Sequence, residues 1–223
     1  LVKTVPEDHP QRLDAGGRLA ILLSDTGHYD QAIALISEMI ARRAEHLGLD
    51  HPRTLSWRLS LAVFHLQKRD FAAGEKELKS MLGPVASQFG EESAMLAMVH
   101  NNLGGALRQQ GKVEEAGPHY RYAYEYNLEH SGAEAPNTLM ARHNLANWLL
   151  DDGQIEKAYD EQTACLAISE RTFGPEHNVT AEVLRGLGMA QLALGRLAEA
   201  RASLERSLAI KTALFGDAEG PLA

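Results

Sequence analysis

The sequence predicts an all-α fold, a solenoid of five antiparallel helix pairs, because one pattern recurs every 42 residues without a gap. Repeats are the first feature to seek, since missing them leads to the wrong fold. A leucine followed by Ala or Gly recurs at Leu19, Leu61, Leu103, Leu145 and Leu187. A second column holds Gly48, Gly90, Gly132, Gly174 and Gly216. A third column holds Gly27, Arg69, Gly111, Gly153 and Gly195. Several columns in one register do not arise by chance, so the repeat organises the whole chain.

The first helix of each unit opens at a proline or its substitute, a place where the missing N–H costs nothing. This column holds Pro10, Pro52, Ala94, Pro136 and Asn178. The leucine and small residue lie in mid-helix, where Ala or Gly lets a neighbouring helix approach closely. The glycine of the third column can adopt positive φ, so it ends the first helix with a tight turn.

The second helix starts two residues after the turn, at an aromatic or aliphatic side chain. This column holds Tyr29, Phe71, Val113, Ile155 and Leu197. A small residue for helix contact follows three positions later, and the glycine column that begins at Gly48 ends the helix. We therefore expect five units, over residues 9–50, 51–92, 93–134, 135–176 and 177–217.

The second unit departs from the pattern. Arg69 replaces the turn glycine, and Gly83 and Pro84 lie inside the expected second helix. A proline inside a helix removes a backbone hydrogen bond and kinks or ends the helix. We therefore expect this helix to break near residue 83.

The composition argues against nucleic-acid binding and against association with membranes. The formal net charge is −8, which argues against nucleic-acid binding through a basic face and against an anionic membrane surface. No apolar run approaches the roughly 18 residues that a membrane-spanning helix requires. The lone Cys165 excludes an intramolecular disulfide and fits a reducing compartment, so we expect a cytoplasmic protein.

These motifs resemble those of the tetratricopeptide repeat family. The likeness rests on the leucine–small pair, the turn glycine, Ala32, and the small residues Ala123, Cys165 and Ser207. The 42-residue unit, with its Gly-x-x-His-Pro-like linker, is similar to the repeats of kinesin light chains and of many bacterial signalling proteins. HEAT and armadillo repeats have similar lengths but lack this spacing. The resemblance covers essentially the whole chain and implies a right-handed superhelix.

The ends of the sequence look cut, not capped. Residues 1–8 align with the end of a preceding helix and its linker, and residues 218–223 with the start of a further linker. Solenoids normally finish in atypical units with polar outer faces. We therefore expect a fragment of a longer protein, whose uncapped ends could self-associate.

The resemblance implies a concave groove lined mainly by the first helix of each unit. The groove is more apolar in the first two units than in the later ones, with Ile21, Leu59, Val63 and Leu66 at groove positions. The later units present polar side chains at the equivalent positions. These candidate peptide-binding residues are Asn101, Asn102, Arg108, His143, Asn144, Asn147 and Arg185.

Asparagine can grip an extended peptide backbone, because its amide both donates and accepts hydrogen bonds. Arg108 and Arg185 could hold a carboxylate through paired N–H donors. In related repeats, asparagines equivalent to Asn102 and Asn144 clamp peptide ligands. The alternative is that these polar side chains are simply solvated.

The sequence offers no candidate for catalysis. Cys165 occupies a small-residue packing position with no histidine placed beside it, so we expect a buried, inert thiol. His9, His51 and His177 recur at the linkers and look structural. We expect neither a metal site nor a cofactor.

Two interpretations of function remain. In the first, the array is a protein–protein interaction scaffold that holds a peptide or helix in its groove. In the second, it is the regulatory or sensor arm of a larger bacterial signalling protein, such as an NTPase, a kinase or a transcription regulator. The partner is then a protein or peptide, or another domain of the same polypeptide, and an enzyme is not expected.

Overall fold

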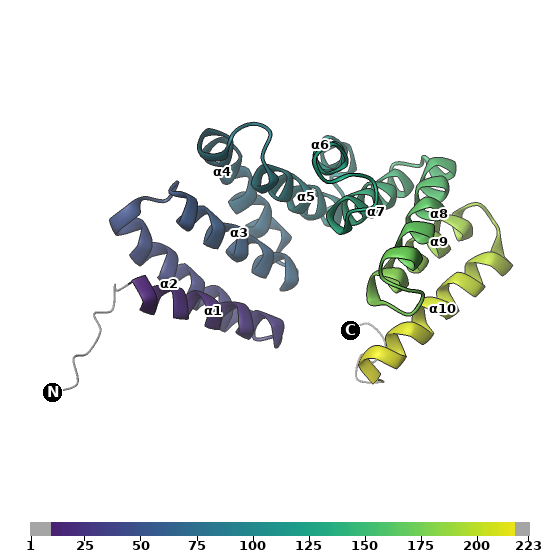
Figure 1. Ribbon diagram of the computed structural model, residues 1–223, viewed down its shortest axis with the longest axis horizontal. Helices are drawn as coiled ribbons and strands as arrows, with labels where there is room; N and C mark the ends of the chain where they lie inside the picture. Colours follow the sequence, from purple (N-terminus) through teal and green to yellow (C-terminus); the bar gives the residue numbers. More distant parts are fainter. Residues whose placement is uncertain (1–9, 217–223) are drawn as a thin grey trace. The chain divides into compact units, whose positions relative to one another are not determined.

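The computed structural model describes residues 10–216, and its secondary structure over this range is helical throughout (Figure 1). The helices form the pairs α1 (Pro10–Asp25) and α2 (Tyr29–Leu47), α3 (Pro52–Gln67) and α4 (Phe71–Phe89), α5 (Ala94–Gln109) and α6 (Val113–Ser131), α7 (Pro136–Asp151) and α8 (Ile155–Thr172), and α9 (Asn178–Ala193) and α10 (Leu197–Phe215). No strand occurs within residues 10–216, so the all-α prediction is confirmed. The helix end expected at residues 1–8 and the linker expected at 218–223 lie outside the described residues.

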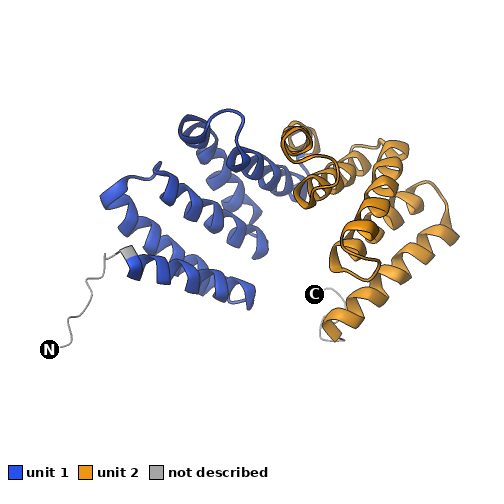
Figure 2. Ribbon diagram, in the orientation of Figure 1, with its two compact units in different colours: residues 1–112 blue, residues 113–223 orange. Residues whose placement is uncertain are grey.

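The chain divides into two compact units, residues 1–112 (unit 1) and residues 113–223 (unit 2) (Figure 2). Unit 1 packs α1 to α5 consecutively, and its first helices also touch, α1 with α3 and α3 with α5. Unit 2 packs α6 to α10 consecutively, and α7 touches α9. Within each unit the first helices of successive pairs therefore lie side by side, which is how a solenoid builds a continuous wall.

The turn column explains why each helix pair reverses direction. Its five residues all have left-handed backbones, with φ from 67° at Arg69 to 80° at Gly27 and Gly153. Arg69 is the one non-glycine residue with positive φ among residues 10–216, and it sits where the 42-residue register requires that conformation. The predicted tight turns are confirmed.

His51 and His177, which the sequence indicated as structural residues of the linkers, act as helix N-caps. The backbone N–H of Arg53 donates to Nδ1 of His51 over 3.2 Å at the start of α3. The N–H of Val179 donates to Nδ1 of His177 over 3.1 Å at the start of α9. Each bond satisfies one of the unpaired donors of a helix N-terminus.

Helix α4 runs unbroken from Phe71 to Phe89, so the expected break near residue 83 is wrong. The fully buried side chains of Met81 and Val85 flank Gly83 and Pro84 and anchor the helix on both sides of them. Gly83 itself is exposed, and apart from its chain neighbours and its own helix backbone no atom lies within 4 Å of the place where its Cβ would stand. Packing of the two flanking turns therefore outweighs the local cost of the proline.

Candidate functional site

In unit 1 the first helices enclose a hollow of about 460 Å³. It is lined from α1, α3 and α5 by Ile21, Asp25, Ser56, Leu59, Ser60, Val63, Phe64, Gln67, Met95 and Met98. Ile21, Leu59 and Val63 are three of the four apolar groove residues that the sequence indicated. The fourth, Leu66, is not among the lining residues.

Apolar side chains dominate this hollow. Ile21 and Met98 are 42% and 52% exposed, large values for side chains of this kind, while Leu59 is buried beneath them. The hydroxyls of Ser56 and Ser60 donate to backbone carbonyls of α3, to Pro52 O and Ser56 O. The one charged lining residue is Asp25. The hollow can therefore receive an apolar side chain beside a basic or N–H-donating group.

Three of the candidate peptide-binding residues lie on α5, in unit 1. Asn101, Asn102 and Arg108 are half-buried. The Asn102 amide donates from Nδ2 to the carbonyl oxygen of Met98 over 2.8 Å, which holds the side chain along the helix beside a lining residue of the hollow.

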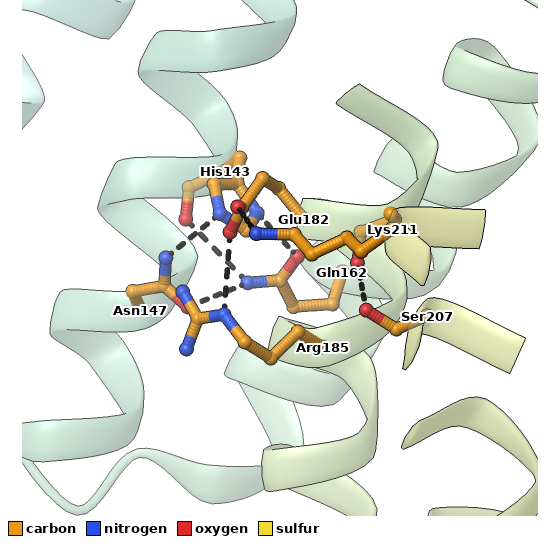
Figure 3. A network of polar contacts seen from close by, with 8 residues as sticks. His143, Asn147, Gln162, Glu182, Arg185, Ser207 and Lys211 are labelled. Carbon is orange, nitrogen blue, oxygen red and sulfur yellow. Dashed lines mark hydrogen bonds and ion pairs between the residues drawn. The ribbon is translucent and has the colours of Figure 1, made fainter. Parts of the chain in front are cut away.

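The other four candidates lie in unit 2, on α7 and α9, and two of them are buried. His143 and Asn147 are 3% and 8% exposed. Both contact Gln162 of α8, which is 1% exposed and which the sequence reasoning missed (Figure 3). Gln162 occupies a column that is apolar in the other four repeats, so this break in the pattern was the signal that could have found it. That column otherwise holds Ile36, Leu78, Tyr120 and Leu204.

The three buried side chains close a ring of hydrogen bonds. Nδ1 of His143 lies 2.9 Å from Oε1 of Gln162, and Nε2 of Gln162 donates to Oδ1 of Asn147 over 3.0 Å. Nδ2 of Asn147 completes the ring, 3.0 Å from Nε2 of His143. Because the Asn147 amide nitrogen can only donate, the ring requires a neutral imidazole with its proton on Nδ1. These hydrogen bonds join α7 to α8 beneath the surface. His143 and Asn147 therefore hold the two helices together and are not exposed to a ligand.

Gly186 of α9 packs against the Gln162 amide of this ring. A Cβ at this position would stand 2.5 Å from Nε2 of Gln162, so only glycine lets α9 pack over the amide. This close approach presents the neighbouring Arg185 at the surface, where its side chain is 52% exposed. Asn144 lies half-buried on α7.

An ion-pair cluster orients Arg185 (Figure 3). Its Nε donates to Oε2 of Glu182 over 3.2 Å, and Nζ of Lys211 donates to Oε1 of the same carboxylate over 2.5 Å. Burial alone would raise the pKa of Glu182, but the hydrogen bond from Lys211 and the charge of Arg185 outweigh it and lower that pKa. The ionised carboxylate therefore holds both cations at neutral pH.

Cys165 shows the properties expected of an inert packing thiol. It is fully buried, and this burial raises the pKa of the thiol to about 12, so the nucleophilic thiolate does not form at neutral pH. Across residues 10–216, no three His, Cys, Asp or Glu side chains gather in a way that could hold a metal ion. None of the helices described is both long and apolar enough to cross a bilayer.

Comparison with known proteins agrees with this architecture. Models of the tetratricopeptide repeat match residues 12–53, 95–160 and 137–213. The chain is 21% identical over 174 residues to clustered mitochondria protein homologs of Aedes aegypti and Culex quinquefasciatus. This alignment covers 78% of the chain, but the chain spans only 12% and 13% of the lengths of those two proteins.

Two solved structures share the fold. Nearly identical repeats of a kinesin-light-chain-like protein from Podosopora anserina superpose with a TM-score of 0.75 at 23% identity, covering 95% of this chain and 99% of that one. Bacillus thuringiensis PlcR, solved in complex with the peptide PapR7 and DNA, gives a TM-score of 0.70 at 15% identity, covering 93% and 72%.

Proposed function

Because the chain belongs to the tetratricopeptide repeat family, we propose that it is a protein-interaction scaffold that binds a peptide or helix of its partner along its first helices. The observation that carries this proposal is the hollow of unit 1, an accessible apolar surface built from three successive first helices. Exposed apolar residues gathered in a concavity are typical of binding sites, whereas the same residues scattered over a surface are not.

Polar side chains would add specificity. Asn101, Asn102 and Arg108 on α5, and Asn144 and Arg185 in unit 2, are the side chains that we propose contact ligand amides or carboxylates. His143 and Asn147 belong to the same proposal as supporting residues, since the buried ring with Gln162 holds the helices that carry Asn144 and Arg185. The structure of PlcR in complex with the peptide PapR7 and DNA supports a peptide as the ligand class.

A peptide-display selection against the purified chain, followed by fluorescence anisotropy with the selected peptide, tests the proposal. We expect Met98→Glu and Ile21→Glu to weaken binding at least about tenfold, because each places a charge against an apolar ligand group. Asn102→Ala and Asn144→Ala should each weaken binding about fivefold, the usual loss for one hydrogen bond.

Leu208→Glu is the matched control. Leu208 is 66% exposed on α10 and does not line the hollow, so this change adds the same charge outside the lining and should leave binding unchanged. Binding that survives the substitutions at Met98 and Ile21 would rule out the hollow, and binding that survives those at Asn102 and Asn144 would rule out the polar assignments.

A second function is favoured by the length of the relatives. The chain spans only 12% and 13% of the lengths of the two mosquito proteins, so in them the matched repeats are one part of a longer polypeptide. On this proposal the array is a regulatory arm that acts on another domain of its own chain, in a signalling protein such as an NTPase, a kinase or a transcription regulator. Sequencing the complete reading frame tests it, and a frame that encodes only repeats would exclude it.

A further inference from the structure

The hollow of unit 1 lies within the row of first helices and not at its edge. Helix α3 supplies six of the ten lining residues, and it contacts both α1 and α5 (Figure 1). The hollow is therefore formed by three successive repeats. Its apolar residues have polar groups beside them, and the chemistry of those groups indicates which ligand the hollow fits.

Two helices end beside the hollow. Asp25 is the last residue of α1 and Gln67 is the last residue of α3, and both line the hollow. The two helix ends lie together, because the hydroxyl of Ser24 donates to Oε1 of Gln67. Carbonyl groups at a helix C-terminus carry partial negative charge, and the last turn of α1 contains no basic residue that would offset it. This end of the hollow therefore favours a cation.

The polar side chains of the hollow offer mainly hydrogen-bond acceptors. The hydroxyls of Ser56 and Ser60 already donate to backbone carbonyls, so their oxygen lone pairs are what they offer a ligand. Asp25 adds a carboxylate, which only accepts, and it is the one charged lining residue. Gln67 can still donate through its amide nitrogen. A ligand that matches this set of groups brings N–H donors and a positive charge.

The stability of the fold does not explain the carboxylate of Asp25. Asp14 of the same helix forms an ion pair with the buried Arg43, whereas the Asp25 carboxylate has no ion pair or hydrogen bond within residues 10–216. A negative charge at a helix C-terminus also opposes the helix dipole. Asp25 is thus an exposed, unpaired carboxylate next to an apolar surface, which is the arrangement that a cationic ligand requires.

We propose that the hollow binds a segment of a partner protein in which a lysine or arginine lies beside a large apolar residue. This inference rests on the proposed function, because it names the ligand class of the same hollow. The apolar side chain contacts Ile21, Val63 and Met98, and the cation lies against Asp25. The flexible side chains of Met95 and Met98 let the hollow accept more than one kind of apolar residue.

The spacing of the lining residues sets the spacing of the ligand residues. Ile21 and Asp25 are one helical turn apart, a separation of about 5–6 Å. Two ligand side chains match this separation when they are three or four residues apart on a helix, or two apart on an extended chain. The net charge of −8 also attracts a basic segment over longer distances.

A charge reversal tests the ligand class. The peptide-display selection is carried out in parallel against the wild-type chain and Asp25→Lys, whose folds circular dichroism compares. Asp25 is exposed, so the fold should be kept. The wild type should enrich peptides with Lys or Arg beside a large apolar residue, and Asp25→Lys should enrich Asp or Glu at that place. Wild-type peptides without a basic residue would contradict the proposal.

Fluorescence anisotropy with a selected peptide then locates the cation. Asp25→Asn should weaken binding about fivefold and make it less sensitive to NaCl, because a charge-assisted hydrogen bond at an exposed rim is lost. Replacing the basic residue of the peptide by Gln should weaken wild-type binding by about the same factor. The same replacement should hardly change binding to Asp25→Asn, since the two charges act as a pair.

Asp160→Asn is the matched control for the change in net charge. Asp160 is exposed on α8 and does not line the hollow, so its substitution removes the same charge and should leave binding unchanged. Equal losses for Asp25→Asn and Asp160→Asn would overturn the proposal, because the attraction would then come from the charge of the whole chain.

Met98→Gln separates this inference from the proposed function. It removes an exposed apolar contact of the hollow without adding charge, and it should weaken binding about fivefold. Peptides that are weakened by Met98→Gln and not by Asp25→Asn would refute the basic ligand class and leave the hollow as a binding site. Peptides that Met98→Gln does not affect would refute the hollow itself, and the ligand class with it.

Discussion

Gly186 of α9 lies against the side-chain amide of Gln162 from α8, so closely that a Cβ on residue 186 would stand 2.5 Å from Nε2. The amide cannot yield freely, because it bonds both His143 and Asn147. We expect Gly186→Ala to lower the free energy of unfolding by about 1–2 kcal/mol, a broken buried hydrogen bond less the gain in helix propensity. Urea denaturation measures it.

Gly83→Ala is the matched control for Gly186→Ala. Both glycines lie inside helices, but a Cβ at residue 83 would have no atom within 4 Å apart from its chain neighbours and its own helix backbone. The Pro84 ring disfavours the α region for a preceding residue that has a Cβ, and this cost offsets the propensity gain of about 0.5–1 kcal/mol, so the free energy of unfolding should change little. Equal effects at the two positions would show that the contact with Gln162 does not matter.

The buried ring predicts a non-additive set of substitutions. Gln162→Leu places a residue that the second repeat has in this column, yet it should cost about 1–3 kcal/mol, because His143 and Asn147 lose buried partners. Changing all three residues to their second-repeat counterparts, as Gln162→Leu, His143→Leu and Asn147→Val, should recover most of that loss, since no polar group remains unpaired. A triple variant less stable than Gln162→Leu alone would contradict this account.

Arg69 carries a backbone conformation that suits glycine, with φ of 67°. In this region a side chain destabilises the folded state by about 1–2 kcal/mol. Glycine removes that cost, but its greater freedom in the unfolded chain opposes folding by about 0.5–1 kcal/mol. Arg69→Gly should therefore stabilise the fold, by less than about 1 kcal/mol. Lys68→Gly, at a neighbouring residue with φ of −68°, should destabilise it. Thermal unfolding followed by circular dichroism compares the two.

The ionised Glu75 carboxylate should make the free energy of unfolding decrease in acid. Hydrogen bonds from Lys112 and Lys79, with a further one from Gln110, lower the pKa of this carboxyl from 4.5 to about 2. The stabilisation is fully present above pH 4.5 and disappears as the pH falls through about 2.

Glu75→Gln should therefore lose roughly 1 kcal/mol of stability at pH 7 and show a flatter decline in acid than the wild type. Urea titrations at several pH values measure both effects. Glu205→Gln, which removes an exposed i,i+4 pair with Arg201, should change neither value measurably. Parallel acid profiles for wild type and Glu75→Gln would refute the role of the cluster.

Cys165 should be protected from thiol reagents in the folded chain. Burial raises the pKa of its thiol to about 12, and the side chain has no exposed surface. At pH 8 the native thiol should react at least about a thousandfold more slowly than the same thiol in urea, because reaction awaits local opening. Quenching the labelling reaction at successive times and measuring the labelled fraction by mass spectrometry gives both rates. Fast labelling of the native chain would disprove the buried position of Cys165.

The sequence by itself determined the elements that depend on local chemistry. A left-handed backbone at a tight turn is a property of one residue and its neighbours, so the register located even the turn at Arg69, where no glycine marks it. The sequence also indicated that His51 and His177 are structural linker residues, and the structure makes each of them the N-cap of the helix that follows.

Only the tertiary structure decided what happens where distant segments meet. Local rules end a helix at Gly83 and Pro84, but burial of Met81 and Val85 against neighbouring helices keeps α4 whole. Local rules likewise place His143 and Asn147 beside Asn144 as similar polar residues of α7. Their burial depends on Gln162, nineteen and fifteen residues away, and on the bare backbone of Gly186. Free energies of packing are set by such contacts between segments, which a pattern along one helix does not contain.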